Sequence, residues 1–268
     1  MTGPRDASLS LDGRRIEASW WGPGPDASPT LVLLHEGLGS VALWRGFPAA
    51  LAARTGLGVL AYSRFGYGAS DTAPVPRPLR YMHEEAEGVL GRVLDAAGVR
   101  RCVLVGHSDG ASIALIYAGS VADHRVRGIA LMAPHVMVEP MCVEEIARTK
   151  ERYETTDLRA RMAKYHRDVD AAFLGWNRAW LDPGFPEALQ LQPEIAHVRV
   201  PILVIQGEAD PYGTMEHLRI IREEAYSPVD AVTLPGIGHA PHLEAPDATL
   251  AAVRDFADRL FTIHEPAS

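Results

Sequence analysis

The stretch Gly106-His107-Ser108-Asp109-Gly110 decides how this sequence folds. It follows the apolar run Cys102-Val103-Leu104-Val105 and precedes a segment, residues 111–118, whose apolar side chains recur at helical spacing. A Gly-x-Ser-x-Gly pattern between a buried strand and a helix is typical of the nucleophile elbow, a tight turn that exposes the serine hydroxyl. The pattern therefore predicts that Ser108 is a nucleophile at the end of a strand.

A serine hydroxyl is a weak nucleophile at neutral pH, so it requires a base, and an acid must orient that base. The apolar run of residues 202–205 leads into a loop that carries Asp210. The short apolar segment of residues 231–234 leads into a Gly/Pro-rich loop that carries His239. We predict that His239 is the base and that Asp210 is the acid that holds its imidazole.

Other residues could fill either role. His242 lies three residues beyond His239 and is a second candidate for the base. We prefer His239 because it directly follows the glycine that ends its loop, whereas His242 begins a turn that leads into a helix. Glu208 and Glu139 are alternative acids.

Four further stretches carry motifs of a known family: His35-Glu36-Gly37-Leu38-Gly39, Arg64-Phe65-Gly66-Tyr67-Gly68-Ala69-Ser70-Asp71, the Gly-x-x-Asp of residues 207–210 and the Gly-His-x-Pro-His-x-Glu of residues 238–244. With the elbow, they show that the chain resembles the α/β-hydrolase superfamily over nearly its whole length. The resemblance implies an α/β fold with a mostly parallel, eight-stranded sheet flanked by helices, and a Ser108–His239–Asp210 triad. Two positions depart from the family pattern. The usual His-Gly pair is here His35-Glu36-Gly37, and Tyr62-Ser63 replaces the usual aspartate before the Arg-Gly loop.

The tetrahedral intermediate of acyl transfer needs two or more backbone amides to stabilise its oxyanion. We expect one amide from Asp109, the residue after the nucleophile. The other should come from Gly37, or from Leu38 if the register of the turn is shifted by one residue. The Asp109 carboxylate would place negative charge near the oxyanion, so we expect it to pair locally and to be structural. Arg64 is expected to hold its own loop rather than to reach the pocket.

Strands and helices alternate along most of the chain, which favours one doubly wound sheet. Residues 134–201 break this alternation, because they show helical periodicity and no convincing strand. We predict a core of residues 1–134 and 196–268, with residues 135–195 inserted as a helical lid, or cap, above the carboxyl ends of the strands. The alternative is a surface elaboration far from the chemistry. Four large aromatic residues are candidates for the walls of a substrate pocket: Trp44, Phe173, Trp176 and Trp180.

The composition argues against several classes of partner. The 268 residues include 34 acidic and 26 basic side chains and carry a net charge of −8, so we expect neither a nucleic acid nor a membrane as partner. No apolar run approaches the ~20 residues of a membrane span, and the polar first ten residues lack the apolar stretch of a signal peptide. With only two cysteines, a structural disulfide is not expected. We expect a cytoplasmic protein with a small-molecule substrate. Its oligomeric state is open, with a homodimer as one possibility.

No metal or cofactor is predicted. The run His83-Glu84-Glu85 lacks the second histidine of a zinc helix, and His239 and His242 have no supporting Cys or Glu at ligand spacing. The Gly66-x-Gly68 turn lacks the remainder of a dinucleotide fingerprint.

These observations favour a cofactor-free serine hydrolase that cleaves a small carboxylic ester or lactone through an acyl-enzyme intermediate. Three alternatives remain open. Hydrolases of carbon–carbon bonds in ring-cleavage products usually carry a tryptophan after the histidine, and this chain has Ala240 there. A thioesterase or amidase would use the same triad. A ligand-binding receptor on the same fold would keep the triad without turnover.

Overall fold

The computed structural model describes residues 3–262. Within them, most strands are short, buried apolar runs, and they alternate with helices along the chain. The strands are Arg5–Asp6 (β1), Leu9–Leu11 (β2), Arg14–Ile16 (β3), Ala18–Trp21 (β4), Thr30–Leu34 (β5), Gly58–Tyr62 (β6), Cys102–His107 (β7), Val126–Met132 (β8), Ile202–Gly207 (β9) and Val229–Leu234 (β10).

Strand β8 divides the helices into two groups, those before it and those after it in the chain. The helices before β8 are Val41–Trp44 (η1), Phe47–Thr55 (α1), Tyr81–Glu85 (α2), Ala86–Leu90 (η2), Gly91–Ala96 (α3) and Asp109–Ser120 (α4). Those after β8 are Pro140–Thr155 (α5), Leu158–Met162 (α6), Val169–Trp180 (α7), Phe185–Ala188 (α8), Gln192–His197 (α9), Glu216–Glu224 (α10), Pro241–Glu244 (α11) and Pro246–Thr262 (α12).

The main sheet has eight strands in the order β1-β4-β6-β5-β7-β8-β9-β10. Strand β4 runs antiparallel to both of its neighbours, and the pairs from β6 to β10 are all parallel. The mostly parallel, eight-stranded sheet that the family resemblance implies is thus confirmed. Strands β2 and β3 form a separate two-stranded sheet beside it.

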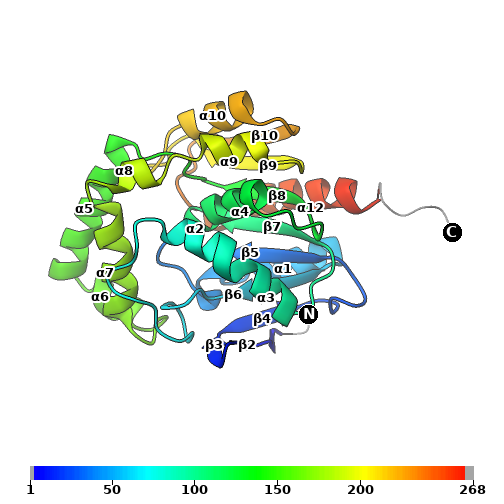
Figure 1. The fold of residues 1–268 in the computed structure, drawn as a ribbon, viewed down its shortest axis with the longest axis horizontal. Helices are drawn as coiled ribbons and strands as arrows, with labels where there is room; N and C mark the ends of the chain where they lie inside the picture. The colour runs from blue at the N-terminus through cyan, green and yellow to red at the C-terminus, as the bar shows by residue number, and fades with distance from the viewer. Residues whose placement is uncertain (1–2, 263–268) are drawn as a thin grey trace.

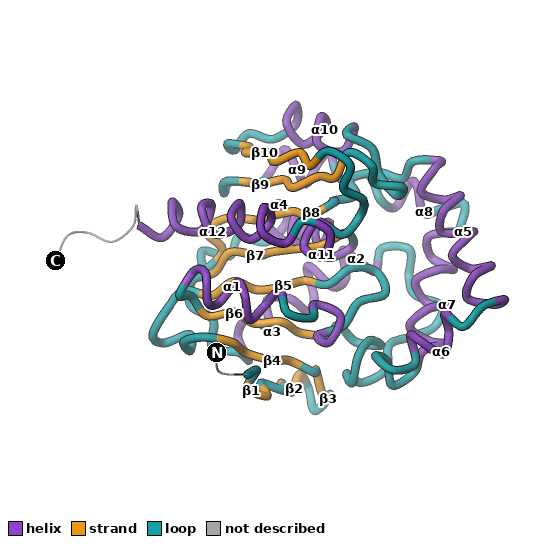
Figure 2. The backbone as a smooth tube through the Cα atoms, turned by 180° about the vertical axis from the view of Figure 1, so that it is seen from behind, coloured by secondary structure: helices purple, strands orange, loops and turns teal. Residues whose placement is uncertain are grey.

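The side chains of each strand point alternately to the two faces of the sheet, and helices bury both faces. In β5, Leu31 and Leu33 belong to the apolar core on one face, and Val32 and Leu34 belong to the core on the other. Helices α1 and α12 cover the first face, and α2, α3 and α4 cover the second, as the two opposite views show (Figures 1 and 2). Because the strands from β6 to β10 are parallel, their carboxyl ends meet at one edge, where loops gather functional side chains.

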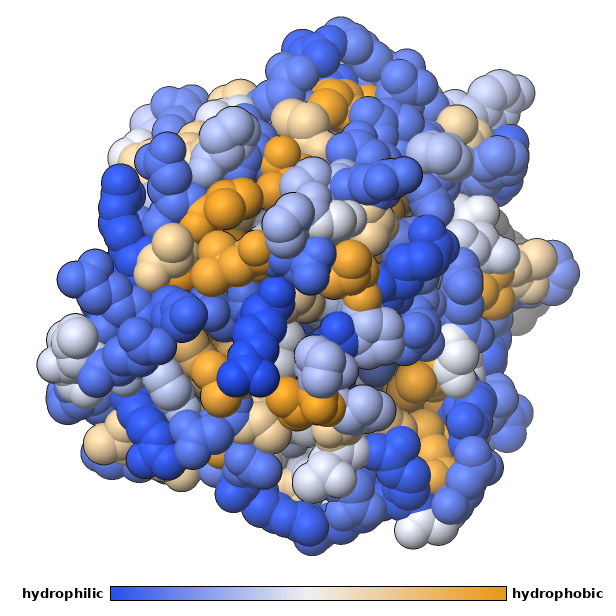
Figure 3. Space-filling model, turned by 60° about the vertical axis from the view of Figure 1, so that its left-hand side comes forward, coloured by the Kyte–Doolittle hydropathy of each residue, from blue (hydrophilic) through white to orange (hydrophobic). Residues whose placement is uncertain are grey.

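Five helices, α5 to α9, separate β8 from β9. Helices α5, α6 and α7 pack on one another and lie beyond the carboxyl ends of the strands, on the left of Figure 1. Helix α9 instead packs against α4 of the core. Figure 3 turns this side forward and shows apolar side chains in short strips between polar ones. No helix within residues 3–262 is long and apolar enough to cross a membrane.

Candidate active site

Ser108 occupies the sharp turn between β7 and α4, where its backbone has φ 53° and ψ −119°. Few residues with a side chain adopt a positive φ, so this turn is strained. Two glycines allow it. A Cβ at Gly106 would lie 2.3 Å from the carbonyl oxygen of Gly110, and a Cβ at Gly110 would lie 2.0 Å from the carbonyl oxygen of Leu34. The turn has the geometry expected of a nucleophile elbow.

The structure brings together the three side chains that the sequence predicts as a triad. Nε2 of His239 lies 2.9 Å from Oγ of Ser108. Nδ1 of His239 lies 2.9 and 2.8 Å from the two carboxylate oxygens of Asp210. Because a carboxylate accepts hydrogen bonds, His239 Nδ1 carries the proton, which leaves Nε2 free to accept the serine proton.

Asp210 is held in place by two further donors. The backbone amide of Tyr212 donates to its Oδ1 at 2.8 Å, and the side-chain amide of Gln206 donates to its Oδ2 at 3.1 Å. Burial raises the pKa of Asp210, but the hydrogen bond and charge of His239, with these two donors, outweigh burial and lower it. Asp210 therefore stays ionised as the partner of the imidazole.

The alternative candidates lie elsewhere. Glu139 contacts Nε2 of His217 at 2.9 Å and accepts two hydrogen bonds from Thr214 at 2.8 Å. Glu208 is exposed to solvent. His242 is buried, with its ring centroid 4.9 Å from that of Trp44, and burial lowers its pKa to about 3. Glu139 is bound to other partners, Glu208 faces solvent and His242 packs on Trp44. None of the three therefore competes with Asp210 as the acid or with His239 as the base.

Backbone amides for an oxyanion meet beside Ser108. Gly37, Leu38 and Asp109 all line the cavity above the serine. Asp109 is the first residue of α4, so its amide belongs to the unsatisfied N-terminal turn, where the helix dipole favours negative charge. Within residues 3–262, no acceptor is found for the amides of Gly37, Leu38 or Asp109. These amides are available to an oxyanion bound at Ser108.

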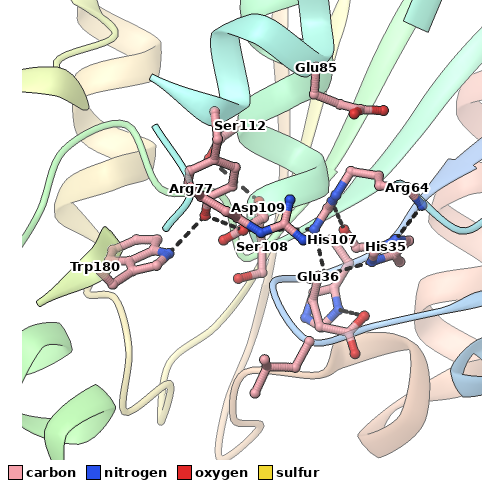
Figure 4. A network of polar contacts seen from close by, with 12 residues as sticks. His35, Glu36, Arg64, Arg77, Glu85, His107, Ser108, Asp109, Ser112 and Trp180 are labelled. Atoms are coloured by element: carbon pink, nitrogen blue, oxygen red, sulfur yellow. Dashed lines mark hydrogen bonds and ion pairs between the residues drawn. The ribbon is translucent and has the colours of Figure 1, made fainter. Parts of the chain in front are cut away.

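A buried arginine ties the turn of residues 35–39 to the elbow (Figure 4). Arg64 donates to the carbonyl oxygens of His35 at 2.6 Å and Glu36 at 3.0 Å, and its Nη2 lies 3.8 Å from the carboxylate of Asp109. The guanidinium also lies 5.0 Å from the ring centroid of Tyr67 in its own loop, so the prediction that Arg64 holds its own loop is incomplete. The guanidinium reaches the neighbouring turn because β5 and β6 are adjacent parallel strands.

The Asp109 carboxylate is 1% exposed and takes its partners from distant segments. The hydroxyl of Tyr81 donates to it at 2.5 Å and in turn accepts a hydrogen bond from Nε1 of Trp180 at 3.0 Å. Burial raises the pKa of Asp109, and Arg64 and Tyr81 partly oppose this rise. The expected local pairing is thus replaced by a chain of contacts that reaches α7.

The cavity above Ser108 has a volume of about 120 Å³. Its walls combine the carboxyl edge of the sheet with side chains of α5 and α7. The lining residues are Glu36, Gly37, Leu38, Ser108, Asp109, His135, Cys142, Ile146, Thr149, Trp176, Trp180, Tyr212 and His239. Two larger hollows, of about 510 and 590 Å³, open around Tyr117 and Asp123 near the other end of α4, away from the serine.

Only two of the four aromatic candidates line this cavity, Trp176 and Trp180. Trp44 packs in the core on the opposite face of the sheet, 5.9 Å from Phe47 between ring centroids. Phe173 stacks on Tyr153 at 3.7 Å, between α7 and α5. The predictions for Trp44 and Phe173 are therefore wrong, since each ring buries its area against another aromatic ring.

Several lining residues escaped the sequence prediction. His135 follows β8 by three residues, and Tyr212 follows Asp210 by two. Both residues follow the carboxyl end of a strand, β8 or β9, and this position alone could have identified them as candidates for the cavity wall. Ile146 and Thr149 of α5 carried none, because nothing local shows which face of a cap helix meets the sheet.

Neither a metal cluster nor a disulfide is found in the described part of the chain. No group of three or more His, Cys, Asp or Glu side chains within residues 3–262 is arranged to hold a metal ion. Cys102 and Cys142 are both free and buried.

Comparison with known proteins agrees with this architecture. A family model described as the alpha/beta hydrolase family matches residues 31–253. The chain belongs to that family. Epoxide hydrolase B of Mycobacterium tuberculosis is 32% identical over 126 residues, which are 47% of this chain and 35% of that protein. The chain thus matches about a third of the length of this curated relative.

Solved structures of hydrolases share the fold over almost the whole chain. The 2-hydroxy-6-oxo-6-phenylhexa-2,4-dienoate hydrolase from Rhodococcus sp. strain RHA1 superposes with a TM-score of 0.78 at 18% identity, over 98% of this chain and 100% of that one. The enol-lactonase from Burkholderia xenovorans LB400 has a TM-score of 0.71 at 20% identity, over 93% and 99%. At these identities the likeness establishes the fold.

Proposed function

We propose that the protein is a cofactor-free serine hydrolase that cleaves a small carboxylic ester or lactone through an acyl-enzyme intermediate. The observation that carries this proposal is the 2.9 Å contact between Oγ of Ser108 and Nε2 of His239, with Asp210 on the other ring nitrogen. A nucleophile, a base and an orienting acid in this order are what acyl transfer to serine requires.

In the proposed reaction, Ser108 Oγ attacks the carbonyl carbon of the substrate and its proton passes to His239 Nε2. The carbonyl oxygen becomes an oxyanion, which the amides of Asp109 and of Gly37 or Leu38 stabilise. The carbon–oxygen bond to the alcohol oxygen then breaks, and this oxygen takes the proton from His239. The alcohol leaves when the substrate is an ester and stays attached to the acyl chain when it is a lactone. A water molecule repeats the sequence on the acyl-enzyme, which releases the acid and restores Ser108.

The chemistry of serine favours an acyl substrate over an epoxide. Attack of a serine oxygen on an epoxide carbon would form an ether, which the second, hydrolytic step does not cleave. An ester or lactone instead gives an acyl-enzyme that water can open. The match to an epoxide hydrolase covers only 47% of this chain and 35% of that protein.

The size and lining of the cavity argue for a small substrate. Its volume of about 120 Å³ is well below the 300–1,000 Å³ or so of typical ligand pockets. Leu38, Ile146 and Trp176 form apolar walls, and Thr149 and Tyr212 add hydroxyl groups that contact each other at 3.3 Å. We infer that the helices of the predicted lid close over the acyl group, because α5 and α7 supply five of the lining residues: Cys142, Ile146, Thr149, Trp176 and Trp180.

Two measurements test the proposal. A fluorophosphonate probe should label the wild-type protein at Ser108, and labelling should be lost in Ser108→Ala. The protein should also hydrolyse short p-nitrophenyl esters or small lactones, with thioesters, anilides and ring-cleavage products compared in the same panel. Labelling without turnover on the whole panel would favour a ligand-binding receptor. Absence of both labelling and turnover would refute the serine hydrolase.

A further inference from the structure

The imidazole of His107 lies between Gly106 and Ser108 in the elbow, and the mechanism above assigns it no role. Its ring is buried, and Nε2 lies 2.7 Å from the backbone carbonyl oxygen of His239. Because a carbonyl oxygen only accepts, Nε2–H of His107 donates this hydrogen bond. The residue before the nucleophile is thus bonded to the residue that carries the proposed base.

The other ring nitrogen of His107 faces the turn that supplies an oxyanion amide. Nδ1 lies 3.8 Å from Oε2 of Glu36 (Figure 4). Burial raises the pKa of Glu36, but the interaction with His107 and with nearby imidazoles outweighs burial and holds it well below the usual range. Glu36 is therefore a carboxylate throughout the neutral range, and a fixed negative charge lies beside the His107 ring without a hydrogen bond to it.

Glu36 is itself firmly placed. Its backbone carbonyl oxygen accepts hydrogen bonds from Nδ1 of His35 at 2.7 Å, Nη2 of Arg64 at 3.0 Å and the amide of Gly39 at 3.1 Å. A Cβ at Gly39 would lie 2.3 Å from Oε2 of Glu36, so the glycine leaves the room that the carboxylate occupies. The partner of His107 is therefore a charge on a rigid turn.

The surroundings of the His107 ring leave it little freedom. The ring of His242 meets it edge-on at 4.8 Å, and the ring of His239 lies at 5.2 Å. Three segments meet on this imidazole: the turn of Glu36, the elbow and the loop of His239. Each contributes a group that the proposed reaction needs in register with the other two.

We propose that His107 is a positioning residue that, through its hydrogen bond to the backbone carbonyl of His239, keeps the imidazole of His239 within reach of Ser108. The kinetic part of this inference rests on the proposed function. A displacement of about 1 Å at a reacting group can cost about 100-fold in rate, so loss of the anchor should appear in kcat. The substrate walls would be untouched, and KM should change little.

Two substitutions separate positioning from simple space filling. His107→Phe keeps a planar ring but removes the donor to the carbonyl of His239. His107→Gln places an amide N–H near the former Nε2 and can restore that hydrogen bond. The matched control is His83→Phe, because His83 is also buried beside a carboxylate, Glu194 at 3.2 Å, but does not line the cavity.

We expect His107→Phe to lower kcat by about 10- to 100-fold with KM within about threefold of the wild type, and His107→Gln to recover most of the loss. His83→Phe should retain the wild-type kcat. Equal loss in the Phe and Gln variants of His107, or wild-type kcat in His107→Phe, would overturn the proposal.

A second readout needs no substrate and keeps this inference separate from the proposed function. The Nδ1 proton of His239, hydrogen-bonded to Asp210, should give a downfield proton NMR signal that is absent in Asp210→Ala. We expect this signal to shift or broaden in His107→Phe, to return in His107→Gln and to stay in place in His83→Phe. An unchanged signal in His107→Phe would refute the positioning role, even if the wild-type protein hydrolyses no ester at all.

Discussion

The two walls of the candidate active site are built in different ways. The wall on the sheet side consists of loops that directly follow strands, and Ser108, Asp210 and His239 lie on three of them. Backbone geometry and short hydrogen bonds hold these residues. The wall on the cap side consists of helix faces, with Ile146 on α5 and Trp176 on α7, held by apolar packing.

This difference separates chemistry from selectivity. Groups that exchange a proton must meet within about 3 Å, and the carboxyl edge of a parallel sheet provides fixed points for them. A wall of packed side chains only has to exclude water and match a shape, so it tolerates other apolar residues. Substitutions on the sheet side should therefore lower kcat, and substitutions on the cap side should alter the preference among acyl groups.

The largest effect is expected from loss of the nucleophile. Ser108→Ala removes the atom that attacks the carbonyl, so kcat on the best ester should fall by about 10⁶-fold. Long endpoint assays with the wild-type protein and the variant at known protein concentrations would measure the loss. Retention of more than about one per cent of the activity would show that another residue is the nucleophile.

Asp210→Asn should have the next largest effect. The amide keeps the shape of the side chain but can donate to Nδ1 of His239, which favours the wrong tautomer, and kcat should fall by about 10⁴-fold. Steady-state kinetics at neutral pH would measure the loss. Glu139→Gln is the control, because Glu139 binds Thr214 and His217 instead, and equal losses in both variants would contradict the assignment.

A matched pair of tryptophans tests the cap side directly. Trp176→Phe should enlarge the cavity and shift kcat/KM toward longer acyl groups by about tenfold. Trp44→Phe should leave that preference unchanged, because Trp44 packs in the core on the other face, and should lower the free energy of unfolding by about 2 kcal/mol. An acyl series from acetate to hexanoate, with denaturant melts, would measure both. Identical acyl preference in the two variants would contradict the wall assigned to Trp176.

A last effect leaves catalysis aside and concerns the stability contributed by His242 in α11. His242 is buried and burial lowers its pKa to about 3, below the ~6.5 of an unfolded histidine. Between these values the unfolded chain binds the extra proton, so the protein loses stability as the pH falls from about 6.5 toward 3. Urea melts across this range should show His242→Leu with a pH slope weaker than the wild type by about 1.4 kcal/mol per pH unit. An unchanged slope would mean that His242 is protonated in the folded protein.

Local patterns predicted much of the sheet side. Ser108 could be found because a tight strand–turn–helix connection demands glycine at Gly106 and Gly110, whatever surrounds it. The choice of His239 over His242 followed from a glycine in the same loop. These inferences needed only neighbours along the chain, and the structure brings the same residues together.

Long-range contacts were less predictable. Arg64 was expected to hold its own loop, and besides the ring of Tyr67 there it also holds the turn of Glu36. Asp109 was expected to pair locally, and its partner is Tyr81. Such side chains can reach several segments, and the sequence does not state which segment lies beside them.

By itself, the sequence determined the α/β sheet and the elbow, because strand periodicity and turn stereochemistry are local constraints, and its family motifs pointed to the three residues of the predicted triad. Only the tertiary structure decided which aromatic rings face the cavity, where Trp176 lines the wall and Phe173 stacks on Tyr153. It alone also placed His107 between Glu36 and the backbone of His239. The reason is physical: an apolar or polar side chain on a helix or strand end is satisfied by many partners, and packing of the whole chain selects among them.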